Sequence, residues 1–381
     1  MIQFKVSAPG KVILFGEHAV VHGKTAIAAS LSLRTTVEFT ELPEAEQVIK
    51  ICFPKINFFL NVPLQQIQNF FFINRNPESA ENHEMLYSRV KEFVGTIDCA
   101  NLQQKSSLEA FLYLFVSITQ KEESHIRPFQ IFLITELSVS AGLGSSASFA
   151  VCLAACFLHW SHLQKNIDKA FDTFDLKSIS KYALNSERIM HGTPSGIDNS
   201  ICTYGSIIEF KKGESVKPMS TTHIMKILLV DTRVSRSTKL LAEKLAALKR
   251  DYPVIIDSIL DSIDNISKEA LKVVQKINSS TTDKEALFKG YEQLMTLINI
   301  NQGLLAACQV SHPSLDSICA EARNYALAAK LTGAGGGGHA YILLLPDTQP
   351  ETISSISRKL IADGFTVTLT SLGGAGVQIH K

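Results

Sequence analysis

Residues Ser138–Ser148, SVSAGLGSSAS, form the segment of the sequence that says most about the fold. The apolar run Phe129–Thr135 precedes it and predicts a buried strand, and a long apolar segment from Ala147 to about His162 predicts a helix. Glycines in such a turn let the backbone approach a ligand closely, and the free N–H groups at a helix start attract anions. The segment therefore predicts a phosphate-binding loop, with an ordinary helix cap as the alternative.

Hydroxyl groups at the start of this helix point to a nucleotide as the ligand. The chain contains no GxxxxGK[ST] pattern, so the segment is not a Walker A loop. Ser145 and Ser146 stand at the helix entry instead. A serine hydroxyl at this place can contact a nucleotide phosphate or ligate Mg²⁺.

Two carboxylates flank a turn in Glu187–Asp198, ERIMHGTPSGID. A helix predicted from about Ile179 to Met190 carries Glu187 near its end, and the glycines and proline that follow can return Asp198 to the same cleft. One carboxylate can then hold Mg²⁺ while the other accepts the proton of an attacking alcohol. Two solvated acidic side chains are the alternative.

The N-terminal segment Ser7–Gly23, SAPGKVILFGEHAVVHG, supplies a cation and further polar groups. Lys11 follows a Pro-Gly turn, where its charge can stabilise a transferring phosphoryl group or lower the pKa of a substrate hydroxyl. Glu17, His18 and His22 can hydrogen-bond a hydroxylated substrate. A structural histidine in a loop is the alternative for each of the two imidazoles.

The last glycine-rich segment is Lys330–Gly338, KLTGAGGGG, which leads into an apolar strand predicted over Ala340–Leu345. Four successive glycines are entropically unfavourable in an ordered domain. We therefore expect the backbone here to pass close to a ligand or to another loop, and a flexible linker is the alternative.

Composition limits the classes of function. The 381 residues carry 37 Lys and Arg against 36 Asp and Glu, so no overall positive field predicts binding to nucleic acid or to an acidic membrane. Seven scattered cysteines without a CxxC pair suit a reducing compartment. The N-terminus does not resemble a signal peptide, and we expect no membrane span and a cytoplasmic location.

The order of predicted elements indicates an α+β protein with two domains, residues 1–222 and 223–381. Short strands are predicted over about Ser200–Phe210, and helices over Thr238–Arg250, Pro253–Ile277 and Asp283–Cys308. The phenylalanine-rich residues Phe53–Phe72 suggest core packing, or else a subunit or lipid-like-ligand contact.

Together and in this order, the segments resemble the three motifs of the GHMP kinase superfamily, which is named for galactokinase, homoserine kinase, mevalonate kinase and phosphomevalonate kinase. GKVILFGEHAVVHG, ELSVSAGLGSSAS, ERIMHGTPSGIDNS and KLTGAGGGGHA are most similar to its mevalonate kinase branch. The resemblance implies a GHMP kinase fold, with a ribosomal protein S5-like N-terminal domain and a ferredoxin-like C-terminal domain. It also implies ATP- and Mg²⁺-dependent phosphorylation of the C5 hydroxyl of (R)-mevalonate, giving 5-phosphomevalonate for isoprenoid synthesis.

Residue roles also follow from the resemblance. Asp198 is implied as the catalytic base beside Lys11, Ser146 and Glu187 as Mg²⁺ ligands, and Glu17 with Arg236 as a polar pair between the lobes. The residues implied for ATP binding are Lys11, Lys55, Thr135, Ser140, Ala141, Gly142, Leu143, Gly144, Ser145 and Ser146, and those implied for the mevalonate site are Glu17, His18, Asp198, Thr238, Gly333 and Ala334.

Three positions depart from the family pattern: Lys55 near the adenine, Ser140 in the phosphate loop, and His339 after the glycine run. The resemblance also implies a homodimer and inhibition by prenyl diphosphates that compete for the nucleotide site. Two other functions are weighed against it: a relative acting on another alcohol or on a phosphorylated substrate, and a non-catalytic ligand sensor.

Overall fold

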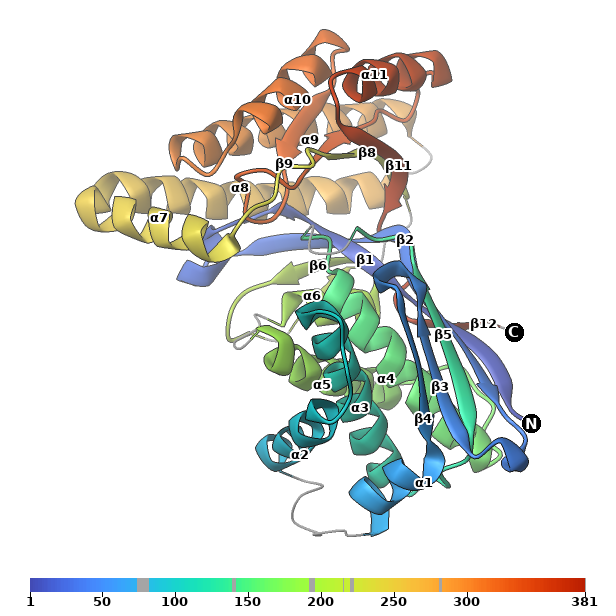
Figure 1. The fold of residues 1–381 in the computed structure, drawn as a ribbon. Helices are drawn as coiled ribbons and strands as arrows, with labels where there is room; N and C mark the ends of the chain where they lie inside the picture. The colour runs from blue at the N-terminus through green and yellow to red at the C-terminus, as the bar shows by residue number, and fades with distance from the viewer. Residues whose placement is uncertain are drawn as a thin grey trace.

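The computed structural model describes residues 1–73, 82–138, 142–191, 196–214, 216–219, 223–280 and 283–380, with the backbone alone for 189–191. Two lobes meet at a shared sheet, and the chain termini lie together on the outer side of the lower lobe (Figure 1).

The predicted α+β class is confirmed. The strands are β1 Gln3–Phe15, β2 Ala26–Glu41, β3 Val48–Phe53, β4 Phe58–Pro63, β5 Phe129–Thr135, β6 Ile207–Phe210, β7 Lys217–Met219, β8 Met225–Asp231, β9 Ala328–Leu331, β10 His339–Leu343, β11 Thr366–Leu372 and β12 Gln378–His380.

Helices cover the sheet in both lobes (Figure 1). They are α1 Leu64–Ile67, α2 His83–Gly95, α3 Leu102–Lys121, α4 Ser145–Gln164, α5 Thr173–His191, α6 Ile197–Tyr204, α7 Thr238–Asp251, α8 Pro253–Ser279, α9 Lys284–Ala307, α10 Pro313–Asn324 and α11 Pro350–Ala362. The helices predicted within residues 238–308 are confirmed with shifts of one or two residues at their ends.

The lower lobe is built on the antiparallel pair β1–β2, with β5 and β6 also paired to β2. The alternate residues Phe4, Val6 and Ala8 of β1 face a core that also contains α3 and α4. A register shift between Pro9 and Lys11 interrupts the pairing of β1 with β2. Such a bulge re-aims the side chain that follows it, which here is Lys11.

The upper lobe is an antiparallel sheet in the order β11–β8–β10–β9. Ile227 and Leu229 of β8 pack toward α8 and α9, and the intervening Leu228 and Val230 pack toward α10 and α11. Because both faces are covered, this strand is a continuous apolar run rather than an alternating one. The core on the α8 side also includes residues of β1 and β2, so the two lobes share part of one core.

The strands predicted over Ser200–Phe210 are partly wrong. Helix α6 occupies Ile197–Tyr204, and only Ile207–Phe210 forms a strand. Gly196 adopts a left-handed conformation with φ 86° and starts the helix, and the buried residues Ile197 and Ile201 lie one turn apart. Asp198 consequently stands in the first turn of a helix.

Helix α4 departs from the expectation that no segment suits a membrane. Ser145–Gln164 has the length and hydropathy of a membrane span, although 83% of its most apolar window is buried inside the protein. It packs against β1, β2, α3 and α5. In this structure the uncharged composition of the helix matches its position at the centre of a core.

The proposed boundary between residues 222 and 223 stays a prediction, because residues 220–222 lie outside the described ones. The phenylalanine-rich segment packs mainly into the lower core, where the Phe53 ring contacts Phe58, Phe111 and Phe149. Phe59 is an exception and is exposed. All seven cysteines are free.

Candidate active site

The centre of the candidate site is an ion pair between Lys11 and Asp198. The Nζ atom of Lys11 lies 3.0 Å from Asp198 Oδ1, and the side chains are 8% and 33% exposed. The lysine is therefore almost fully withdrawn from solvent while the carboxylate remains accessible. The first turn of α6 places Asp198 where the helix dipole favours a negative charge.

Gly144 makes room for the lysine. It adopts φ 69° and stands directly before α4, and a Cβ atom added there would lie 2.8 Å from Lys11 Cγ. The backbone N–H of Lys11 donates to the Leu143 carbonyl at 2.9 Å. The glycine-serine loop is thus fastened to the strand that carries the cation, and the lysine side chain crosses over the glycine toward Asp198.

The start of α4 presents the features of an anion site. Ser145 and Ser146 occupy its first turn and are half-buried, and Leu143 in the preceding loop is buried. Ser148 Oγ donates to the Ala8 carbonyl at 2.8 Å, which fixes the helix start against β1. Of the residues implied for ATP binding, Ser140 and Ala141 lie outside the described residues.

Glu187 on α5 is buried, with an exposed fraction of 3%. Burial and then the charge of Asp198 raise the pKa of its carboxyl to about 8, and Lys11 acts in the opposite direction. Within the described ranges, no residue donates a hydrogen bond to this carboxylate. Burial thus disfavours the charged form of this carboxyl, and a bound cation would supply the positive charge that the charged form needs.

Arg236 reaches from the upper lobe to the phosphate loop. A Cβ atom added to Gly142 would lie 1.8 Å from Arg236 Nη2, and one added to Gly338 would lie 2.8 Å from Arg236 Cζ. Its Nη1 also donates to the Thr332 carbonyl at 3.4 Å. Two glycine-rich segments far apart in the chain therefore meet around one guanidinium group.

The predicted pair between Glu17 and Arg236 is wrong. The Glu17 carboxylate accepts from Lys330 Nζ instead, and both side chains are fully buried. A buried carboxylate needs a partner that can be enclosed with it, and Lys330 lies within the upper core. Glu17 is thus not exposed to a ligand in this structure.

His18 connects the lobes beside the glycine run. Its Nε2 donates to the Ala334 carbonyl at 2.8 Å, and its own backbone has φ 62°, a conformation uncommon for residues other than glycine. Burial lowers the pKa of the imidazole, so its neutral form is favoured. Gly333 and Ala334 lie in the same turn, within reach of Arg236 and His18 respectively.

The glycine run packs against protein rather than serving as a linker. Added Cβ atoms at Gly335 and Gly337 would lie 2.0 Å from the Val310 carbonyl oxygen and 2.8 Å from Val234 Cβ. The expected close approach is therefore to other loops of the upper lobe at these two positions. His339, directly after the run, is buried with Nε2 3.8 Å from Asp231 Oδ2.

Three other predicted residues lie at the edges of elements. Thr238 is exposed at the start of α7, and Lys55 is exposed in the short turn Pro54–Ile56. Thr135 ends β5, where its hydroxyl hydrogen-bonds that of Thr35 at 2.9 Å. Their roles in binding stay predictions.

Lys330 is the residue that sequence reasoning left without a role. It begins the KLTGAGGGG segment but stands in the strand Ala328–Leu331, whose four residues are all buried. A lysine inside an apolar strand requires a buried partner, so this pattern could have signalled an ion pair. It could not have identified Glu17, which lies 313 residues earlier in the chain.

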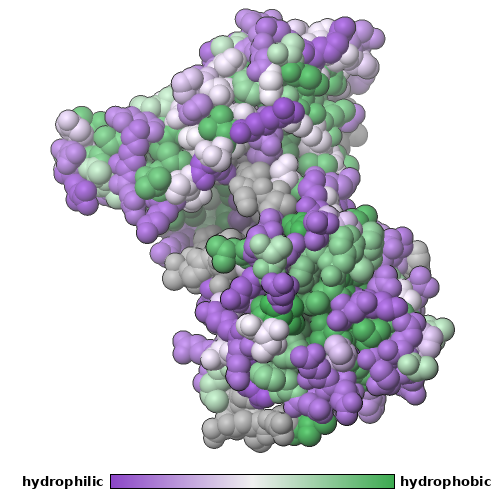
Figure 2. Space-filling model, viewed as in Figure 1, coloured by the Kyte–Doolittle hydropathy of each residue, from purple (hydrophilic) through white to green (hydrophobic). Residues whose placement is uncertain are grey.

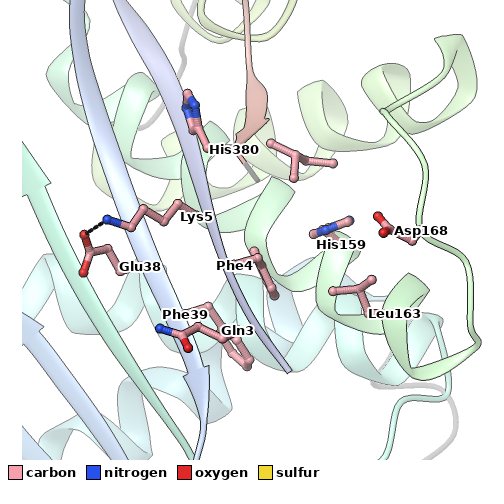
Figure 3. A pocket seen from close by; sticks show the side chains of 10 residues that line it. Gln3, Phe4, Lys5, Glu38, Phe39, His159, Leu163, Asp168 and His380 are labelled. Carbon is pink, nitrogen blue, oxygen red and sulfur yellow. Dashed lines mark ion pairs between the residues drawn. The ribbon is translucent and has the colours of Figure 1, made fainter. Parts of the chain in front are cut away.

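A separate pocket of about 410 Å³ lies on the lower lobe, between the start of β1, β2, the end of α4 and β12 (Figure 3). The Lys5–Glu38 ion pair closes one side, and His159 and Asp168 stand on the other. Its lining includes none of the residues predicted for the active site.

The surface is indented where the lobes meet, below the arm formed by α7 and α8 (Figure 2). Strand β1, helix α6 and the start of α4 converge near this junction (Figure 1). The arrangement brings together a glycine-serine helix start, two carboxylates and a buried cation. A phosphoryl transfer site needs these components.

Comparison with known proteins also points to a phosphoryl-transfer enzyme. GHMP kinases N terminal domain matches residues 110–206, and GHMP kinases C terminal matches residues 284–362. The chain is 36% identical to mevalonate kinase of Bos taurus, over 98% of this chain and 94% of that protein.

Solved structures share the whole fold. The mevalonate kinase of Methanococcus jannaschii superposes with a TM-score of 0.72 at 24% identity, covering 98% of this chain and 99% of that one. The L. major mevalonate kinase in complex with R-mevalonate superposes with a TM-score of 0.68 at 22% identity, covering 99% and 97%. The predicted GHMP kinase fold, S5-like and then ferredoxin-like, is confirmed. With a full-length relative at this level of identity and both halves matched, the chain belongs to the mevalonate kinase family of the GHMP kinases.

Proposed function

We propose that this protein transfers the γ-phosphoryl group of ATP to the C5 hydroxyl of (R)-mevalonate, giving 5-phosphomevalonate and ADP. The observation that carries the proposal is the Lys11–Asp198 pair, in which an accessible carboxylate is held 3.0 Å from a nearly buried cation. Asp198 accepts the hydroxyl proton as the oxygen attacks phosphorus in line, and no phosphoenzyme forms. Lys11 stabilises the charge on the phosphoryl oxygens.

ATP binding is assigned to the loop before α4 and its first turn. Gly142 and Gly144 have φ of 79° and 69°, a left-handed backbone conformation that residues with a Cβ atom rarely adopt. The free N–H groups of α4 and the hydroxyls of Ser145 and Ser146 then face the phosphates. Lys55 and Thr135 are assigned to the nucleotide through family resemblance.

Mg²⁺ fits the residues that surround Asp198. Glu187 is a buried carboxylate whose pKa is raised by burial and by the charge of Asp198, and Ser146 offers a hydroxyl at the helix start. Oxygen ligands of this kind suit Mg²⁺, which takes its remaining ligands from phosphates and water. When bound, Mg²⁺ neutralises charge on the triphosphate during transfer.

Replacing Glu187 by glutamine tests the metal assignment. We expect the Mg²⁺ concentration for half-maximal activity to rise by about tenfold or more. Loss even of a group that only supports a metal ligand typically lowers metal affinity or activity by about 10- to 100-fold. The variant Glu209→Gln, at a carboxylate on β6, is the control. An unchanged Mg²⁺ requirement in Glu187→Gln contradicts the assignment.

The same substitution has an expected effect on the metal-free protein. The folded-state pKa of Glu187, about 8, lies above its ordinary value of 4.5, so the folded protein binds this proton more tightly than the unfolded chain. The stability that the protonated Glu187 provides is fully present below pH 4.5 and is lost as the pH rises toward 8. Glutamine resembles the protonated carboxyl but does not lose a proton. Glu187→Gln should therefore raise the melting temperature more at pH 8 than at pH 5.

The acceptor is assigned to the space between the lobes. We assign it to His18, Thr238, Gly333 and Ala334, with His18 already bonded to the Ala334 carbonyl, while Glu17 would act from behind through its buried pair with Lys330. The solved L. major relative holds R-mevalonate. A purified-protein assay of ATP consumption with mevalonate, phosphomevalonate, homoserine and galactose tests the substrate: activity confined to mevalonate is expected, and a preference for another alcohol contradicts the proposal.

We also propose a cytoplasmic homodimer that prenyl diphosphates inhibit. A diphosphate can occupy the same N–H groups at the start of α4 as the ATP phosphates. Farnesyl diphosphate is therefore expected to raise the apparent KM for ATP without changing kcat in steady-state assays. Inhibition that is not relieved by excess ATP contradicts a shared site.

A further inference from the structure

A buried ion pair joins the two lobes behind the candidate site. Glu17 follows β1 in the lower lobe, and Lys330 stands on β9 in the upper lobe. Lys330 Nζ donates to Glu17 Oε1, and both side chains are 0% exposed. Lys330 also donates to the Leu331 carbonyl at 2.8 Å, and Asn301 Nδ2 donates to Glu17 Oε2 at 3.3 Å. Each charge is thus enclosed with polar partners.

Aromatic rings from both lobes enclose the lysine. The Nζ atom of Lys330 lies 6.0 Å from the centre of the Phe15 ring and 5.5 Å from that of Tyr341. Ring faces at these distances attract a cation. The Tyr341 hydroxyl donates to the Leu14 carbonyl at 3.0 Å, which adds another contact between the lobes. The lysine therefore has one defined position, between β1 and the upper sheet.

A pair of this kind is better suited to fixing geometry than to adding stability. Removing two charges from water offsets most of their attraction, whereas removing one partner leaves an uncompensated charge in the interior. Burial lowers the pKa of Lys330, and Glu17 acts against that change. Lys330 therefore depends on Glu17 to remain in the ionised form.

The pair is continuous with the contacts that hold the site together. Two residues after Lys330, the Thr332 hydroxyl accepts from the Ile13 N–H and donates to the Ile13 carbonyl, both at 2.9 Å. One residue after Glu17, His18 donates to the Ala334 carbonyl at 2.8 Å. Ile13 itself lies two residues beyond Lys11 on β1. Displacement of Lys330 would therefore displace the glycine turn relative to the catalytic strand.

We propose that Lys330 is a positioning residue for the phosphoryl transfer. Through its buried pair with Glu17, it holds the turn Thr332–Ala334 and His18 against the end of β1. It thereby shapes the acceptor site. The inference rests on the proposed function. It assigns no contact between Lys330 and substrate, since the side chain is fully enclosed.

Kinetics of Lys330→Met and Glu17→Gln test the proposal. Each single variant is expected to lower kcat/KM for mevalonate by on the order of 10²-fold, the effect of a displacement of about 1 Å at a reacting site. Most of the loss should appear in the KM for mevalonate, with the KM for ATP within about threefold, because the contacts at stake border the acceptor. The double variant, which leaves no lone buried charge, should recover about tenfold.

Glu41→Gln is the matched control. Glu41 is also a buried carboxylate, accepting from Trp160 Nε1 at 2.9 Å and from the Ile2 N–H at 3.0 Å, but it lies on the outer part of β2. Loss of a buried carboxylate interaction should lower the melting temperature of Glu41→Gln, as in the Lys330 and Glu17 variants. The KM of Glu41→Gln for mevalonate should stay unchanged, because Glu41 lies away from the acceptor site. Amide hydrogen exchange provides a second readout: the Ile13 N–H should exchange faster in Lys330→Met and at the wild-type rate in Glu41→Gln.

The outcomes separate this inference from the proposed function. A wild-type protein inactive on mevalonate contradicts the function itself. An active wild type, together with folded single variants whose KM for mevalonate is unchanged, overturns the positioning role. Where the single variants fail to fold, the double variant decides: a raised KM for mevalonate with faster Ile13 exchange supports the role, and wild-type values of both overturn it.

Discussion

Replacing Asp198 by asparagine is expected to lower kcat for mevalonate phosphorylation by on the order of 10⁴-fold, near the upper end of what a general base contributes. Asparagine keeps the size of the side chain and its place in the first turn of α6, but it cannot accept the hydroxyl proton. The affinity for ATP should stay within about threefold, because the nucleotide is held by the loop before α4. Steady-state kinetics and nucleotide binding by titration calorimetry measure the two effects separately.

The control for Asp198→Asn must also remove a carboxylate paired with a lysine. Asp261→Asn does so at the Lys24–Asp261 pair, which lies on the surface between the turn before β2 and α8. It should retain wild-type kcat. Asp198→Asn protein that folds, binds ATP and turns over mevalonate within about tenfold of wild type would contradict the role of Asp198 as base.

Local sequence patterns predicted much of the site. The glycine-serine segment after the apolar strand Phe129–Thr135 indicated the helix start at Ser145, because strand, turn and helix signals all lie within a few residues of one another. The Glu187–Asp198 spacing likewise indicated two carboxylates around a turn. The helix at Ile197–Tyr204 was missed, because eight residues with a β-branched start give too short a periodic signal.

Contacts between distant segments could not be predicted from these patterns. The sequence shows that Gly142 and Gly338 need space, but it does not show that the same Arg236 side chain fills it. The partner of Glu17 was assigned to Arg236 through family resemblance, whereas the folded chain encloses Glu17 with Lys330. The partner of a buried charge is the residue that the neighbouring strand places beside it. Here Lys330 of β9 lies beside Glu17 because of the way the upper lobe packs on the end of β1.

The geometry around Lys11 also explains why the glycine-rich segment before α4 occurs together with it. The lysine must cross from β1 to Asp198, and the missing side chain of Gly144 leaves that path open. The bulge after Pro9 directs the side chain, and the Leu143 carbonyl holds its backbone N–H. Cation, base and phosphate loop are consequently parts of one packed unit.

Lys11→Met is therefore expected to lower kcat by on the order of 10³-fold, the effect of removing one preorganised charge from a transition state of this kind. Methionine retains much of the aliphatic chain that packs over Gly144, so the fold should be preserved. Lys11→Arg should restore little activity, because the side chain is only 8% exposed and a wide, planar guanidinium does not fit the place of a compact ammonium group 3.0 Å from Asp198.

A second effect distinguishes loss of this cation from general damage. Lys11 is the group that lowers the pKa of the Glu187 carboxyl against burial and Asp198. Without it, two carboxylates face each other with less positive charge, so Glu187 holds its proton to a higher pH and more Mg²⁺ is needed at pH 7 to displace it. Lys24→Met, at the surface pair with Asp261, is the matched control and should change neither kcat nor the Mg²⁺ requirement. A Lys11→Met protein with wild-type kcat at saturating Mg²⁺ would show that the cation neutralises only the resting carboxylates and takes no part in phosphoryl transfer.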